Sequence, residues 1–153
     1  LKMQSIYVLE LGQPVGKGRP RFGKGFAYTP KKTRDYEARL KAAAREAMWL
    51  KDLEPFSDFC EVKINAQFEV PKSWTKKKKE LAAHHLIWPK RPDIDNIIKI
   101  ALDSLNGVVY FDDAQVYRVT ALQKYGDPLL AIEVNWKVKN PQSWRTEGLK
   151  VLL

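Results

Sequence analysis

Five aspartates and a single lysine fall between residues 93 and 113. Asp93 and Asp95 flank one apolar residue directly after Pro92, which favours an extended chain in which both carboxylates can point the same way. Two carboxylates arranged in this way can chelate a hard cation. Asp113 follows a short apolar run, so we expect it to reach the same cation from the end of a strand and to close the cluster.

Lys99 and Asp103 follow Asp95 at successive intervals of four residues, which puts the three side chains along one polar stripe of a helix. A lysine beside carboxylates can hold a phosphate oxygen or a water molecule near a bound cation. Cleavage of a phosphodiester needs an activated water and neutralisation of developing charge, and carboxylate-bound Mg²⁺ supplies both. The oxygen-only donors favour Mg²⁺, with Mn²⁺ as the alternative, over zinc.

A purely structural interpretation of the same aspartates is also open. Asp95 suits the N-cap of a helix, Asp103 suits an ion pair with Lys99, and Asp112 with Asp113 suits a turn after a strand. Residue types and spacing alone do not decide between the two interpretations.

The chain is strongly basic, with 27 lysines and arginines against 18 acidic residues and a net charge of +9. Seven basic residues and no acidic one lie between Gly16 and Arg34. Such a strip favours a partner with regular negative charge, above all nucleic acid, although a merely solvated basic surface is the alternative. The residues that we expect to contact DNA are Lys17, Arg19, Arg21, Lys24 and Arg91.

The elements that must position these residues predict an α/β (α+β) fold in a single domain over residues 1–153, with a mixed sheet of about four to five strands and two main helices. Alternating or continuous apolar residues predict strands at 5–11, 60–70, 108–111, 115–125 and 129–138. The main helices are expected at 31–50, after Thr29 as N-cap, and from Asp95 as N-cap to Asn106, with Gly107 just beyond the end.

The connections carry three further expectations. Residues 12–30 are rich in glycine and proline and predict a mobile loop. The lysine run 76–79 leads into a short exposed helix capped by Ser73 or Thr75. Gly126, Asp127 and Pro128 predict a hairpin between the last two strands, and the residues after Lys139 predict a tail.

The single cysteine, Cys60, has no partner for an intramolecular disulfide and is typical of a strand residue in a reducing compartment, which favours the cytosol. No apolar run reaches the length of a transmembrane helix, so we expect no membrane partner.

The segment from Arg91 to Val116 closely resembles the RusA-type Holliday junction resolvases. Their pattern is Asp-x-Asp-Asn, a lysine four residues after the second Asp, a helical Asp-x-Leu and then Asp-Asp-x-Gln, and every element is present. The stretch from Gly18 to Phe22 and Tyr28-Thr29-Pro30 are similar to the amino-terminal part of phage-encoded members. Residues 72–88 and those after Lys139 depart from the family pattern.

The resemblance implies metal-binding carboxylates at Asp93, Asp95 and Asp113, an essential lysine at Lys99, and supporting roles for Asp112, as a further metal ligand, and for Asp103. It also implies a symmetric homodimer that resolves four-way DNA junctions by paired nicks, in recombination and repair. Two alternatives are a non-catalytic DNA-binding module and an endonuclease for flaps or other branched DNA.

Overall fold

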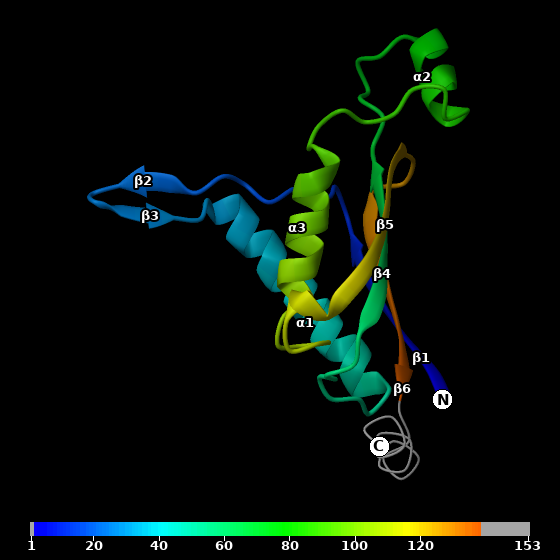
Figure 1. The fold of residues 1–153 in the computed structure, drawn as a ribbon. Helices are drawn as coiled ribbons and strands as arrows, with labels where there is room; N and C mark the ends of the chain where they lie inside the picture. Colours follow the sequence, from blue (N-terminus) through cyan, green and yellow to red (C-terminus); the bar gives the residue numbers. More distant parts are fainter. Residues whose placement is uncertain (1, 139–153) are drawn as a thin grey trace, which may run out of the picture.

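The computed structural model describes residues 2–138, and a four-stranded mixed sheet forms its central layer (Figure 1). The strands are β1 (Lys2–Leu11), β4 (Cys60–Phe68), β5 (Val116–Tyr125) and β6 (Leu129–Val138). They lie in the order β1-β6-β4-β5, with β6 antiparallel to both of its neighbours and β4 parallel to β5. The expected α+β class with a mixed sheet is therefore confirmed.

Two long helices, α1 (Lys31–Leu50) and α3 (Ile94–Leu105), cover one face of the sheet, and the shorter α2 (Lys76–Ala83) lies beyond its end (Figure 1). One face of α1 is buried at every fourth position, through Tyr36, Leu40, Ala44 and Met48. β4 buries every second residue, as a strand with one face on a core must. The buried faces of α1 and β4 thus pack together in one apolar core.

The expected hairpin between the last two strands is wrong. β5 and β6 do not pair with each other, because β4 lies between them and bonds to both. The Gly126 amide donates to the Phe68 carbonyl at 3.0 Å, so the short connection crosses over the end of β4. The regular burial of β4 on the core face gives it the central position, and the local turn signal does not determine which strands pair.

Residues 108–111 do not form the expected strand. Val108, Val109 and Tyr110 are all buried, and Tyr110 makes only isolated bridges to Phe56 and Asn106. The Tyr110 hydroxyl donates to the Leu102 carbonyl at 2.7 Å. A four-residue apolar run fits either a strand or a buried turn, and here it fills the space under the end of α3.

The helix starts also differ by one or two residues from expectation. α3 begins at Ile94 with Asp93 as N-cap, so Asp95 lies in the first turn and is not the cap. α1 has Pro30 as N-cap in place of Thr29. The cap of α2 is Thr75, whose side chain accepts from the Lys78 amide, as expected.

The expected loop over residues 12–30 contains regular structure, namely a two-stranded ribbon of β2 (Arg21–Gly23) and β3 (Phe26–Tyr28). This ribbon projects away from the sheet (Figure 1). The expected tail after Lys139 lies outside the described residues. Among residues 2–138, none of the helices combines the length and apolar character needed to cross a bilayer.

Candidate active site

Two exposed aspartates mark the N-terminal end of α3. Asp93 is the N-cap and Asp95 lies in the first turn, where the helix dipole stabilises negative charge. The side chain of Asp93 is 54% exposed, and Arg91 Nη1 lies 3.3 Å from its Oδ1. Both carboxylates are therefore open to a ligand that arrives from solvent.

This end of α3 is fixed from two sides. Gln123 on β5 donates through Nε2 to the Pro92 carbonyl at 2.8 Å. On the other side, the Lys17 amide donates to the Asn96 carbonyl at 2.9 Å. A Cβ on Gly16 would lie 2.7 Å from Pro92 Cβ, so only glycine permits this approach. The local sequence pattern marks Gly16 only as a loop breaker and does not indicate this packing against Pro92.

Lys17 forms an internal ion-pair network. Its Nζ lies 3.1 Å from Glu37 Oε1 on α1 and 3.1 Å from Asp103 Oδ2 on α3. Burial lowers the pKa of Lys17, but the hydrogen bonds to Asp103 and Glu37 outweigh burial and raise the pKa above its ordinary value of 10.5. The ammonium thus links the loop to both helices. No sequence pattern indicated Glu37, and Lys17, which was expected to contact DNA, is engaged by these two carboxylates.

Asp112 and Asp113 lie at the opposite end of α3. Asp112 caps the single turn η1 (Asp113–Gln115), and its Oδ1 accepts from the Ala114 amide at 2.8 Å. Asp113 Oδ2 lies 3.5 Å from Nδ2 of Asn106, the C-cap of α3. Gln115 secures the turn: Oε1 accepts from the Phe111 and Asp112 amides, and Nε2 donates to the Phe56 and Asp58 carbonyls.

The two ends of α3 are far apart within one chain. The ten residue steps from Asp95 to Leu105 advance about 15 Å along the helix axis. Residues 2–138 contain no group of three Asp, Glu, His or Cys side chains placed to hold a metal ion. Within the described part of one chain, Asp113 therefore does not form a metal-binding group with Asp93 and Asp95.

The sequence matches the family model described as endodeoxyribonuclease RusA over residues 12–145. The chain belongs to the RusA endodeoxyribonuclease family. A Bacillus subtilis (strain 168) protein described as uncharacterized protein YqaN is 32% identical over 133 residues, which cover 82% of this chain and 91% of that protein. The family resemblance expected from the motifs is confirmed, and the protein is a DNA-cleaving hydrolase.

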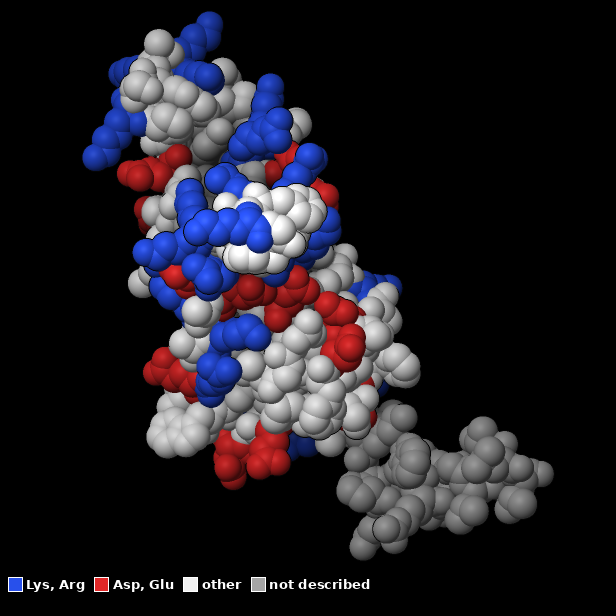
Figure 2. Space-filling view, turned by 90° about the vertical axis from the view of Figure 1, so that its left-hand side faces the viewer, with Lys and Arg blue, Asp and Glu red and all other residues white. Residues whose placement is uncertain are grey.

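The RusA match begins at Gly12, at the end of β1, and therefore includes the projecting ribbon as well as α3 and η1. Arg19, Arg21 and Lys24 of this region are exposed. Figure 2 shows basic side chains around the ribbon and a band of acidic side chains below it. The face that carries the ribbon thus presents a positive surface beside a negative one.

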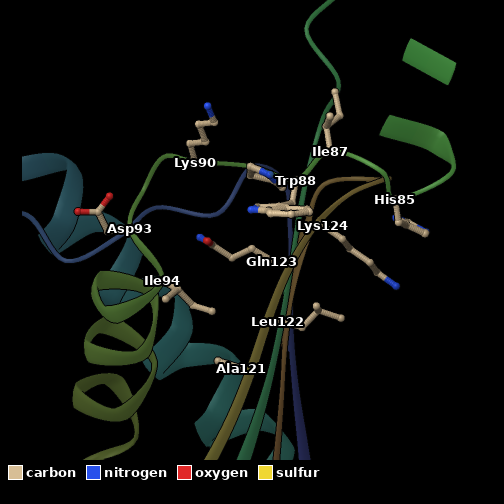
Figure 3. Close-up of a pocket in the computed structure, with 11 residues that line it drawn as sticks. His85, Ile87, Trp88, Lys90, Asp93, Ile94, Ala121, Leu122, Gln123 and Lys124 are labelled. Atoms are coloured by element: carbon tan, nitrogen blue, oxygen red, sulfur yellow. The ribbon is translucent and has the colours of Figure 1, made fainter. Parts of the chain in front are cut away.

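A pocket of about 740 Å³ lies between the segment before α3 and the edge strand β5, and Asp93 stands at its rim. Figure 3 shows the Asp93 carboxylate directed away from Leu122 and Gln123, which line the opposite side. The lining includes exposed apolar side chains, notably Trp88 and Leu122. The Asp93 carboxylate therefore faces the surface outside this pocket.

The acidic end of α3 also affects a buried tyrosine. Burial raises the pKa of the Tyr110 hydroxyl, and the negative charges of Asp113 and Asp103 raise it further. Tyr110 consequently stays neutral and serves as a hydrogen-bond donor to Leu102 under the helix.

Proposed function

We propose that this RusA-family enzyme is a Mg²⁺-dependent resolvase of four-way DNA junctions, with Mn²⁺ as an alternative cation, and that it acts in recombination and repair as a homodimer. The observation that carries the proposal is the RusA match over residues 12–145, which spans the complete acidic segment with the lysine at its family spacing. A cytosolic location belongs to the same proposal, because the buried Cys60 is a free thiol.

The carboxylates Asp93, Asp95 and Asp113, with Asp112 as a further candidate, would hold the cation. Their oxygen-only donor set fits a hard divalent ion, and Asp93 and Asp95 are exposed at the N-terminal end of α3. When bound, the cation supplies an activated water and neutralises charge on the scissile phosphate. Asp112 already accepts the Ala114 amide, so its remaining oxygen would be the one available.

The separation of the two ends of α3 supports a homodimer. Because one chain keeps Asp113 about a helix length from Asp95, a second copy is the simplest source of the missing carboxylate. A two-fold axis would then generate two equivalent sites, matched to two strands of a junction. Paired nicks are the expected product of that symmetry.

Lys99 would steady a phosphate oxygen during cleavage. It is exposed on α3, one turn after Asp95 and one turn before Asp103. Arg19, Arg21 and Lys24 would bind the backbone of the junction arms. Arg91, which pairs with Asp93, is exposed beside the carboxylates and would do the same near the cut.

The test is cleavage of an end-labelled synthetic four-way junction with and without Mg²⁺, beside a duplex and a flapped duplex of the same sequence. We expect Mg²⁺-stimulated nicks at symmetric positions of two opposite strands. Preferential cutting of the flapped duplex would make a flap, and not the four-way junction, the substrate of the enzyme. A failure to cut any of the three substrates in Mg²⁺ or Mn²⁺ would contradict the proposal.

A further inference from the structure

The β2–β3 ribbon carries aromatic rings on both of its faces. In its register Phe22 lies opposite Ala27, and Gly23 lies opposite Phe26. Partners across a ladder share a face and neighbours along a strand alternate, so Phe22 lies on one face while Phe26 and Tyr28 lie on the other. The Phe26 and Tyr28 rings meet edge to face, with centroids 6.4 Å apart.

These rings are not part of the core. Phe22 is 85% exposed, Phe26 is 60% exposed and Tyr28 is 44% exposed. A two-stranded ribbon of three-residue strands is marginally stable alone and gains nothing in water from apolar rings on both faces. Figure 2 shows pale, uncharged side chains on the face turned to the viewer, among lysine and arginine side chains. The arrangement therefore suits a ligand that covers the rings.

The ribbon is fastened close to the proposed cleavage site. The Gly18 amide donates to Oγ1 of the buried Thr33 at 3.0 Å, which ties its base to α1. One residue earlier, the Lys17 amide bonds to the carbonyl of Asn96, the residue that follows Asp95. The base of the ribbon is therefore fixed beside the start of α3, and a ligand as long as a DNA arm can contact both the ribbon and the carboxylates.

The charge of the segment selects the kind of ligand. Residues 16–34 contain seven basic and no acidic side chains, which disfavours contact with a second copy of the same basic segment. Basic side chains interleaved with exposed aromatic rings are typical of surfaces on which nucleic-acid bases stack. In continuous duplex DNA the faces of the bases are covered by their neighbours, so rings can reach them only where stacking is interrupted.

We propose that the β2–β3 ribbon stacks Phe22 and Phe26 on bases that are unstacked at the branch point, and so distinguishes branched DNA from duplex DNA. This inference rests on the proposed function for the identity of the substrate. The stacking itself is a binding property and does not depend on cleavage. Arg21 and Lys24, on the same ribbon, would hold the adjacent phosphates.

The test compares dissociation constants for a four-way junction and a duplex of the same sequence, measured in Ca²⁺ for the wild type and for Phe22→Ala/Phe26→Ala. Loss of stacking on one or two bases is expected to weaken junction binding on the order of ten- to a hundredfold. Duplex binding should change by less than about twofold, because it relies on phosphate contacts. Tyr117→Ala removes an equally exposed aromatic side chain from β5 and serves as the matched control.

Two further variants distinguish stacking from general apolar contact. Phe22→Trp/Phe26→Trp should keep the junction preference, whereas Phe22→Leu/Phe26→Leu should lose it, because leucine is apolar but has no ring. All three double variants should keep the wild-type thermal unfolding midpoint, since both positions are exposed. Analytical ultracentrifugation of Phe22→Ala/Phe26→Ala should show the oligomeric state of the wild type.

Four outcomes would overturn the inference. Equal weakening of junction and duplex binding would make the ribbon a general DNA contact, and conversion of a dimer to monomers would make it a protein interface. An unchanged junction preference, or its absence in the wild type, would remove the role altogether. If the wild type prefers junctions through the two rings but cuts none in Mg²⁺, the proposed function fails and the stacking role stands.

Discussion

Nζ of Lys17 lies 3.1 Å from Oδ2 of Asp103, and this ion pair joins the segment that leads into the projecting ribbon to the last turn of α3. The same ammonium reaches Glu37 on α1, so three elements share one cation. Lys17 therefore stabilises the position of the ribbon, and its charge is already balanced within the protein.

Lys17→Met should lower the free energy of unfolding by about 1 kcal/mol, because Lys17 and its partners are only partly buried and solvent screens them. The raised pKa of Lys17 sets the pH dependence. The stabilisation that Lys17 provides is fully present below pH 10.5, the ordinary pKa of lysine. It is lost as the pH rises through the higher pKa that Lys17 has in the folded protein. Urea unfolding of both proteins between pH 7 and 11 measures the difference. Lys32→Met, at an exposed position of α1, is the control; an equal loss in both variants would contradict the network.

Arg19→Ala/Arg21→Ala should weaken junction binding and flatten its salt dependence, with a decrease of about 0.9 in the slope for each phosphate that the variant no longer neutralises. Lys17→Met should leave that slope nearly unchanged, since its ammonium is occupied by two carboxylates. Titration of labelled junction at several salt concentrations in Ca²⁺ gives the slopes. The interpretation of the basic segment is wrong if Lys17→Met lowers the slope as much as the arginine pair does.

Asp95→Asn should abolish cleavage while it preserves or strengthens junction binding. Loss of the carboxylate weakens cation affinity and removes repulsion between the enzyme and the phosphate. Single-turnover cleavage and binding in Ca²⁺ measure the two effects. Asp52→Asn, at an exposed position after α1, should behave as the wild type. Cutting by Asp95→Asn at the wild-type rate would remove Asp95 from the site.

Lys99→Ala should slow single-turnover cleavage on the order of a hundredfold or more and change junction affinity far less, because a cation placed where charge develops acts mainly on the reaction rate. Lys99 is exposed on α3, one turn after Asp95. Lys63→Ala, which removes an exposed lysine from β4, is the matched control. An unchanged rate would reduce Lys99 to a surface residue without a role in cleavage.

Local patterns predicted the elements that have one strong periodicity. The helical spacing of apolar residues predicted α1, and the alternation of apolar residues predicted β4. The residues that predicted α1 are Tyr36, Leu40, Ala43, Ala44 and Ala47. Gly107 ends α3 with a positive φ, as expected from its position after Asn106. In these cases the residue pattern itself specifies which face is buried.

Long-range relationships were not predictable in the same way. The turn at Gly126 has the composition of a hairpin, but strand pairing depends on β4, which lies about 60 residues earlier in the chain. Similarly, Asp93 and Asp113 belong to one sequence motif, yet their distance depends on how α3 lies along the sheet. The ion pairs of Lys17 join residues from three elements, and no spacing rule connects them.

The parallel pairing of β4 with β5 makes everything between them a single crossover, which leaves the sheet at one end of the strands and re-enters it at the other end. The Pro92 carbonyl is bonded to Gln123, seven residues beyond the first residue of β5, whereas Asp113 shortly precedes that strand, and seven strand steps advance about 23 Å. Lengthening or shortening residues 69–92 would alter the surface around α2 but would leave this spacing unchanged. The strand-to-strand topology thus sets the distance between the two halves of the acidic motif within one chain.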